Sequence, residues 1–328
     1  MFELVAVQQT HVDPGNFSHA GPHERRCDSC KCSRDLHGGS HPMITCTVED
    51  DNGYCSDNRF DEVGVSGVVT SGDLVQLREG MATNGYAVLR GVVPKDRIAE
   101  FNEAIQAEYA AAEKFRGGGS FSGHLNCFPG SRSRFFYEEL KASGVVDAIE
   151  AMRGDRPKAV RATLNFNLPG SVEQHYHTDG LYVDEFIICN IAVVDTTLHN
   201  GAIDMLPGTH QRFYRFWEYA LQRKYRLTTR LPMEAGDILV RYSTVWHRGM
   251  PNKSATPRPM MSLTFGESVE PDVDPFLVHD GKMFFYPNWF NTSRLGRLRE
   301  RTFVAVPKSY SAYRFAKSLR GMKGYASF

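Results

Sequence analysis

The sequence has no excess of charge of either sign and no long apolar run. Its 328 residues include 38 Lys and Arg against 38 Asp and Glu, so the formal net charge is zero. Overall charge therefore does not point to nucleic acid or a membrane surface as a partner. No apolar stretch approaches the roughly 20 residues that a membrane-spanning helix needs. A globular protein without a membrane span is expected.

Cysteine is scarce outside one short segment. Five of the seven cysteines lie between Cys27 and Cys55, and the odd total excludes an evenly paired disulfide framework across the fold. The first seven residues have no basic segment and too short an apolar stretch for a secretory signal. We therefore expect a cytoplasmic protein in a reducing compartment.

Residues 1–80 differ in composition from the rest of the chain. They are rich in Gly, Asp, Ser and His, with few periodic apolar positions, and are expected to be mostly loop or disordered. One hypothesis is a small tetrahedral zinc site built from their thiolates and imidazoles. The candidate ligands are Cys27, Cys30, Cys32, Cys46, Cys55, His23, His37 and His41. An unstructured leader is the simpler interpretation, because a second CxxC at zinc-finger spacing is missing.

A folded domain is predicted for residues 81–328. Helical periodicity indicates helices at 94–115, 135–140, 145–152 and 212–221. Period-two or apolar runs between turn residues indicate strands at 85–90, 159–166, 186–194, 202–206, 237–242 and 260–265. The fold class predicted is mainly β with flanking helices (α+β), arranged as a sandwich or barrel.

Potential metal ligands occur in the strand-rich region. His177 and Asp179 are two residues apart, so on an extended segment they share a face and could chelate one ion. With His247, which ends another strand-like run, they make the two-histidine, one-carboxylate set that holds non-haem Fe(II). Arg258 follows His247 by eleven residues, and an antiparallel turn would bring it beside His247 and one layer deeper. Its guanidinium could bind the far carboxylate of 2-oxoglutarate.

A His-x-Asp pair alone is a weak signal, since His11 and Asp13 form a second copy in the N-terminal region. The alternative is a surface pair with an unrelated histidine and arginine. The strand context and the order of the whole set favour a site at His177. Gln174 and Asn165 are further candidates to face inward with His177, if the register of the chain between them allows it. Either amide could hydrogen-bond 2-oxoglutarate or substrate, or could be satisfied within the core.

Four segments around these residues match one known family as a set. They are QHYHTDG at 174–180, NGAIDMLPGTH at 200–210, GDIL at 236–239 and WHRG at 246–249. Together with Arg258 they resemble the phytanoyl-CoA hydroxylase-like (PhyH) Fe(II)/2-oxoglutarate dioxygenases, over about residues 82–290. The resemblance implies a double-stranded β-helix (jelly roll, cupin-like) that uses Fe(II), 2-oxoglutarate and O2. It implies iron ligation by His177, Asp179 and His247, with Arg258 on the C5 carboxylate of 2-oxoglutarate.

The resemblance also implies a reaction class. An oxygenase that hydroxylates, desaturates or cyclises a small organic substrate, in secondary metabolism, is the preferred interpretation. Asp179 fills the position that related halogenases leave open, which favours hydroxylation over chlorination. Gly249 stands where many relatives have a hydroxyl residue, so the second contact to the co-substrate differs. The rival hypothesis is a non-catalytic jelly-roll binding protein whose working part is a zinc-binding N-terminal segment.

The last part of the chain is basic. Nine Lys and Arg lie between Thr292 and Phe328 against one acid, Glu300, with aromatic residues interleaved. One interpretation is a cationic surface near an anionic or carrier-bound small-molecule substrate. The other is a solvated basic helix packed by its aromatic residues. Nucleic acid is not expected as a partner, because a base-reading motif is lacking.

Overall fold

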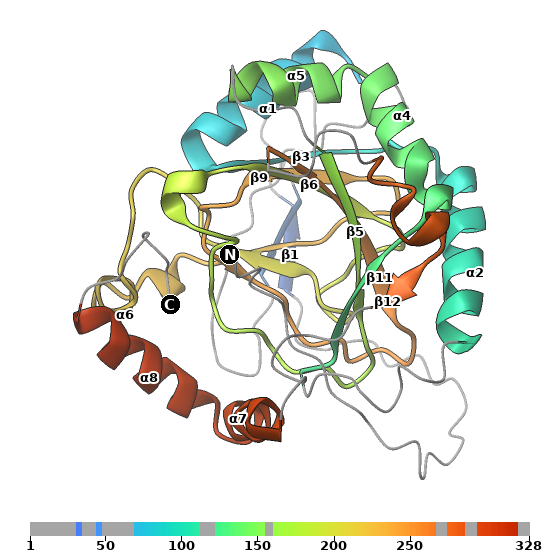
Figure 1. The fold of residues 1–328 in the computed structure, drawn as a ribbon. Helices are drawn as coiled ribbons and strands as arrows, with labels where there is room; N and C mark the ends of the chain where they lie inside the picture. The colour runs from blue at the N-terminus through green and yellow to red at the C-terminus, as the bar shows by residue number, and fades with distance from the viewer. Residues whose placement is uncertain are drawn as a thin grey trace. The chain divides into compact units, whose positions relative to one another are not determined.

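A computed structural model describes residues 31–34, 44–47, 69–111, 122–154, 160–266, 274–285 and 294–320 (Figure 1). The chain divides into two units, Val12–Gly64 and the remainder. In the smaller unit, β1 (Lys31–Arg34) pairs with β2 (Ile44–Thr47) as an antiparallel hairpin. The side chains of the candidate zinc ligands lie outside the described part of the chain, so the zinc site stays a prediction.

Two antiparallel sheets form the body of the larger unit. In the described residues the larger sheet has the strand order β12-β4-β5-β11-β6-β9-β3, and the smaller sheet has the order β10-β7-β8. The larger sheet consists of β3 (Tyr86–Leu89), β4 (His124–Phe128), β5 (Val160–Asn167), β6 (Ile187–Ala192), β9 (Ile238–Tyr242), β11 (Arg258–Phe265) and β12 (Phe284–Phe285). The smaller sheet consists of β7 (Ile203–Met205), β8 (Thr229–Leu231) and β10 (His247–Arg248).

The chain passes back and forth between these two sheets. An isolated antiparallel bridge joins His177 to His247 and so adds the segment after β5 to the smaller sheet. From β5 onward the sheet visited is larger, smaller, larger (β6), smaller (β7, β8), larger (β9), smaller (β10) and larger (β11). This alternation is a jelly roll, or double-stranded β-helix. The predicted fold class is therefore confirmed.

Helices cover one face of the larger sheet (Figure 1). They are α1 (Ser71–Asn84), α2 (Lys95–Ala111), α4 (Arg134–Ala142) and α5 (Val145–Arg153). Successive side chains of β5 point to opposite faces of the sheet. Leu164 and Phe166 are buried in the core beneath the helices, whereas Thr163 and Asn165 line a cavity on the opposite face. The helices thus stabilise the sheet and leave its inner face for polar side chains.

The first helix, α1, begins before the predicted domain boundary near Met81. Thr70 and Asp73 form a capping box, in which the Asp73 amide donates to Thr70 Oγ1 and the Asp73 carboxylate accepts from the Thr70 amide. Leu77 and Met81 are fully buried in the core. Gly85 ends the helix with a φ of 83°, which suits glycine. The predicted boundary therefore falls inside this helix.

Among the described residues, three further helices lie apart from that layer (Figure 1): α6 (Phe216–Leu221), α7 (Arg294–Ala305) and α8 (Pro307–Leu319). The described part of the basic C-terminal segment, residues 294–320, is thus largely helical, and α8 packs against both α6 and α7. Ser318 of α8 is buried, and its Oγ accepts a hydrogen bond from the Trp217 amide at the start of α6. None of the helices in the described residues is long and apolar enough to cross a membrane.

Candidate metal centre

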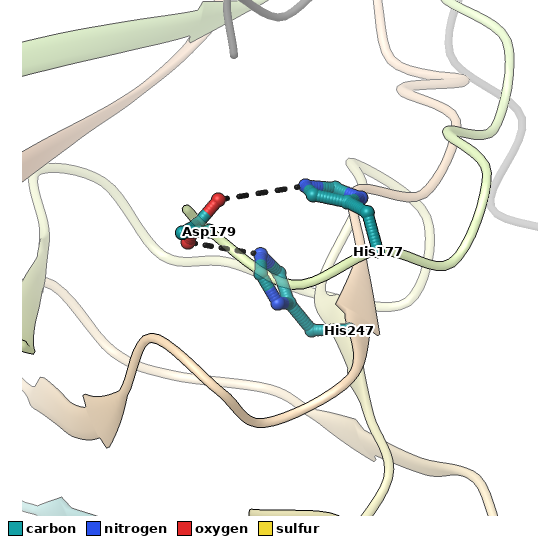
Figure 2. A group of neighbouring side chains, drawn as sticks. All are labelled: His177, Asp179 and His247. Carbon is teal, nitrogen blue, oxygen red and sulfur yellow. Dashed lines mark ion pairs between the residues drawn. The ribbon is translucent and has the colours of Figure 1, made fainter. Parts of the chain in front are cut away.

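Three side chains converge in the cavity between the two sheets. His177, Asp179 and His247 point toward one another (Figure 2), and their potential ligand atoms all lie within 4.8 Å of one another. His177 Nε2 is 3.7 Å from Asp179 Oδ1, and His247 Nε2 is 3.4 Å from Asp179 Oδ2. Two imidazoles and one carboxylate in this arrangement could hold a divalent transition metal and leave further coordination positions open.

Backbone pairing places these three residues. The amide of His177 donates to the carbonyl of His247, and the amide of His247 donates to the carbonyl of His177, each at 2.9 Å. The amide of Asp179 donates to the carbonyl of Ser243 at 2.8 Å, in the turn that follows β9. The segment 177–179 is thus fixed to two neighbouring parts of the chain, and the alternation of an extended segment turns both ligand side chains inward.

Local hydrogen bonds set the orientation of both imidazoles. His177 Nδ1 lies 2.7 Å from the carbonyl of His175, and His247 Nδ1 lies 3.0 Å from the carbonyl of Val245. A carbonyl oxygen only accepts, so each Nδ1 carries the proton and donates it. The Nε2 lone pair then faces the centre of the triad, which is the tautomer that metal ligation through Nε2 requires.

The protonation states also suit a metal. Burial lowers the pKa of His177, and it lowers the pKa of His247 well below its ordinary value. Burial by itself would raise the pKa of Asp179, but the charge of Arg241 outweighs burial and holds that pKa below its ordinary value. At neutral pH the site therefore offers two neutral imidazoles and an ionised carboxylate, the forms that bind metal.

Arg258 is a buried cation in the same cavity, whose volume is about 270 Å³. Its side chain lies on the inner face of the larger sheet, and the residue is 5% exposed. Nη2 donates to the carbonyl of Gly201 at 3.2 Å, and Nε has no hydrogen-bond partner among the described residues. Burial lowers the pKa of Arg258 to about 10, so it stays charged at neutral pH. A buried guanidinium with a single described hydrogen bond is suited to bind an anion.

The predicted placement of Arg258 on a strand adjacent to His247 is wrong. β9 ends at Tyr242, and the chain crosses to the smaller sheet before His247. Arg258 begins β11, which pairs with β5 and β6 in the larger sheet. The crossing is held by Ser243, whose Oγ accepts from the Phe186 amide at 3.0 Å. His247 and Arg258 therefore line one cavity from different sheets.

Gln174 and Asn165 both line the cavity. Asn165 lies an even number of residues from His177, whereas Gln174 lies three residues away and would face outward on a regular strand, which its segment is not. Gln174 Oε1 accepts a hydrogen bond from the Gly249 amide at 2.7 Å. Asn165 Nδ2 donates to the Leu125 carbonyl at 3.2 Å and to Asn126 Oδ1 at 2.8 Å. Each amide thus has one end engaged, which leaves Gln174 Nε2 and Asn165 Oδ1 for a ligand. Their roles in co-substrate binding stay a prediction.

The family resemblance predicts a hydroxyl residue at the place of Gly249, and the structure shows what occupies that space. A Cβ on Gly249 would lie 2.8 Å from Gln174 Oε1 and 3.0 Å from His124 Cε1. The Gln174 side chain therefore occupies the space that a hydroxyl side chain would need. The polar group at this place in the cavity comes from Gln174, on a different segment of the chain.

Two further residues of the cavity were not predicted. Arg241 in β9 donates from Nη2 to Asp179 Oδ2 at 2.6 Å. His124 in β4 is buried, and its ring Nε2 donates to the Val172 carbonyl at 3.0 Å. The sequence contains a signal for Arg241, because a charged residue stands in the otherwise apolar run ILVRY. His124 has no comparable sequence signal, since its strand was not predicted.

A jelly roll with two histidines and one carboxylate in its cavity defines a class of metal-binding β-helix proteins. A sequence model of the phytanoyl-CoA dioxygenase (PhyH) family matches residues 81–260, more than half of the chain. The chain therefore belongs to this family, and the predicted resemblance is confirmed. The family is one of oxygenases, whose members use Fe(II), 2-oxoglutarate and O2.

Individual relatives are more distant. The methylphosphonate hydroxylase of Gimesia maris is 28% identical over 142 residues, which are 41% of this chain and 55% of that protein. The chain thus spans about half the length of this curated relative. AviO1 from Streptomyces viridochromogenes is 19% identical with a TM-score of 0.48, covering 62% of this chain and 98% of that one. EvdO2 from Micromonospora carbonacea, solved with 2-oxoglutarate, is 16% identical with a TM-score of 0.45, covering 65% and 97%.

Proposed function

We propose that the protein is an Fe(II)- and 2-oxoglutarate-dependent oxygenase that hydroxylates a small organic substrate. The observation that carries this proposal is the combination of the triad with Arg258 in one cavity. The triad offers the donor set and protonation states that suit ferrous iron. Arg258 offers a buried, weakly balanced guanidinium that suits a carboxylate.

Each of the cavity residues has its own role in this proposal. His177, Asp179 and His247 would hold the iron, and Arg258 would bind the C5 carboxylate of 2-oxoglutarate. Gln174 and Asn165 are further candidates for contacts to the co-substrate. The bound iron would supply the oxidising chemistry, in which one oxygen atom of O2 enters a substrate C–H bond as the other converts 2-oxoglutarate to succinate and CO2. The chain itself positions these groups and keeps bulk water from them.

Hydroxylation is favoured over chlorination because Asp179 supplies the third ligand of the triad. Desaturation and cyclisation begin with the same removal of a substrate hydrogen and belong to the same proposal. The substrate class is proposed from a relative. By its name the Gimesia maris relative hydroxylates methylphosphonate, a small anion. A small anionic substrate is therefore proposed here as well.

Anaerobic titration with Fe(II) and 2-oxoglutarate tests the metal and the co-substrate together. The iron–keto acid charge-transfer absorption should appear, and aerobic turnover of 2-oxoglutarate to succinate should require Fe(II). His177→Ala and His247→Ala should each lower turnover by at least about 100-fold, since even partners of metal ligands cost 10- to 100-fold. His199→Ala is the matched control, because His199 is exposed and is not among the lining residues of the cavity. Turnover without metal, or full activity in either triad variant, would contradict the proposal.

A further inference from the structure

The two carboxylate oxygens of Asp179 have different surroundings. Oδ2 accepts the charge-assisted hydrogen bond from Arg241 Nη2 at 2.6 Å and lies 3.4 Å from His247 Nε2. Oδ1 lies 3.7 Å from His177 Nε2 and accepts no hydrogen bond from the described residues. The arginine therefore makes an otherwise symmetric carboxylate asymmetric. Such a bond is stronger than one between neutral groups, so it defines which oxygen remains available.

Arg241 is itself held in place by neighbouring strands. The residue is 4% exposed, and its Nε donates to Asn190 Oδ1 at 3.0 Å. Asn190 Nδ2 in turn donates to Ser262 Oγ at 2.7 Å, and these two residues are register partners on β6 and β11. A planar guanidinium with two of its nitrogens fixed has little freedom to turn. The chain from Ser262 through Asn190 and Arg241 thus fixes the orientation of Asp179.

We propose that Arg241 is a positioning residue that restricts Asp179 to one ligating oxygen, Oδ1. This inference rests on the proposed function. A carboxylate can ligate a metal through one oxygen or through both. A second aspartate oxygen on the iron would take a position that the chelating 2-oxoglutarate and O2 need. A metal at Oδ2 would have to share that oxygen with the charged Arg241 donor, which disfavours a second contact from Asp179 and keeps that position open.

A purely structural role for the salt bridge between Arg241 and Asp179 leads to a different prediction. If Arg241 only stabilised the cavity wall, its removal would weaken metal and co-substrate binding together, or neither. If it restricts Asp179, its removal frees Oδ2 to join the metal. Metal binding is then preserved or strengthened, because the site also loses a nearby positive charge that repels the cation. Binding of 2-oxoglutarate is weakened, because Oδ2 competes for a coordination position.

The test separates the two affinities in the full-length protein. Arg241→Met keeps the length of the side chain and removes its charge and donors, and Arg241→Lys restores the charge without the fork. Affinity for Fe(II) is measured alone, and affinity for 2-oxoglutarate is measured anaerobically from the charge-transfer absorption of the ferrous protein. In Arg241→Met the affinity for Fe(II) should stay within about threefold or rise, while that for 2-oxoglutarate falls roughly 10- to 100-fold. Arg241→Lys should recover part of the loss.

A matched control and a second variant keep the test decisive. Arg248→Met breaks an arginine–carboxylate pair of the smaller sheet, where Arg248 Nε lies 2.9 Å from Asp204 Oδ2, and should not split the two affinities. If circular dichroism shows that Arg241→Met is unfolded, Asn190→Ala decides, with a smaller split in the same direction. Equal losses of both affinities, or no loss of 2-oxoglutarate binding, overturn the inference. Failure of the unsubstituted protein to give the charge-transfer band would instead contradict the proposed function.

Discussion

Two buried arginines lie on different sides of the segments that carry the candidate metal ligands, and the two have different surroundings. Arg258 faces the cavity from β11, and Arg314 of α8 packs on the outside, against α6 and the residues that precede the ligands. Burial lowers the pKa of each guanidinium to about 10, so both remain charged at neutral pH. The comparison therefore concerns the same charged group, buried to a similar extent, in two surroundings.

The surroundings of Arg314 stabilise its charge. Its Nη1 donates to the Tyr176 carbonyl at 2.6 Å, and its guanidinium lies 4.1 Å from the ring centre of Phe216 and 5.7 Å from that of Trp246. Aromatic faces attract a cation, most strongly when both are desolvated. Arg258 has one described hydrogen bond, to the Gly201 carbonyl. The difference separates a cation that holds the fold together from one that is available to bind an anion.

The largest expected effect concerns Arg258. Loss of a charge-assisted pair in a partly dry site costs roughly 2–5 kcal/mol, or about thirtyfold to several thousandfold in affinity. Arg258→Ala should therefore raise the apparent KM for 2-oxoglutarate at least tens of fold, while Fe(II) binding stays near normal because the triad is untouched. Arg258→Lys should fall between the two, since an ammonium cannot reproduce the planar fork. Initial rates of succinate formation against 2-oxoglutarate concentration measure the effect.

One outcome would contradict the assignment of Arg258 as the arginine that binds an anion. An unchanged 2-oxoglutarate dependence in Arg258→Ala would show that its charge is not used for binding. The proposed co-substrate site would then lose its main support. Fe(II) affinity, measured in parallel, confirms that the cavity of the variant is intact.

A smaller effect, on stability, is expected at Arg314. A hydrogen bond to a charged group contributes about 1.5–3 kcal/mol, and a desolvated cation–π contact contributes up to about 2 kcal/mol. The variant no longer has the free-energy cost of burying a charge, and this offsets part of the loss. Arg314→Met should therefore lower the free energy of unfolding by about 2–3 kcal/mol in urea denaturation, with the KM for 2-oxoglutarate within about threefold. Lys317→Met, on an exposed position of the same helix, should stay within about 0.5 kcal/mol.

An effect of Arg314→Met on the KM as large as that of Arg258→Ala would contradict a purely structural role for Arg314. It would mean that α8 acts on the metal centre through the segments it contacts. Tyr176 directly precedes His177, and Trp246 directly precedes His247, so the route is physically short.

The candidate ligands could be picked out from the sequence because their pattern is local. His177 and Asp179 are two residues apart on an extended segment, and His247 lies in a short distinctive run, so spacing and strand context carry the signal. The helix-facing positions of β5 follow from the same period of two. The capping box of α1, at Thr70 and Asp73, is also local and could have moved the predicted domain boundary earlier.

The remaining features depend on contacts between distant segments. The run from Ile238 to Trp246 is apolar on both sides of its turn, so it resembles one strand, although the chain changes sheets within it. That change is fixed by bonds to Phe186 and Asp179, which no periodicity in the run reveals. The pairing of Arg241 with Asp179 spans 62 residues. A charged residue in an apolar strand indicates that some partner exists, but only the fold identifies the partner.

His124 provides the last test, because it lies in the same cavity as Arg258 and gives up its charge on burial. Burial lowers its pKa from the ordinary 6.5 to about 4, although the hydrogen bond to the Val172 carbonyl opposes the shift. Between these two values the unfolded chain binds a proton at this position and the folded protein does not. Stability should therefore fall as pH falls from about 6.5 to about 4, by about 1.4 kcal/mol per pH unit, with no further contribution below. His124→Gln, which keeps a donor for Val172, should flatten the dependence of the urea midpoint on pH by one proton, whereas parallel curves for the variant and the parent would show that His124 titrates normally in the fold.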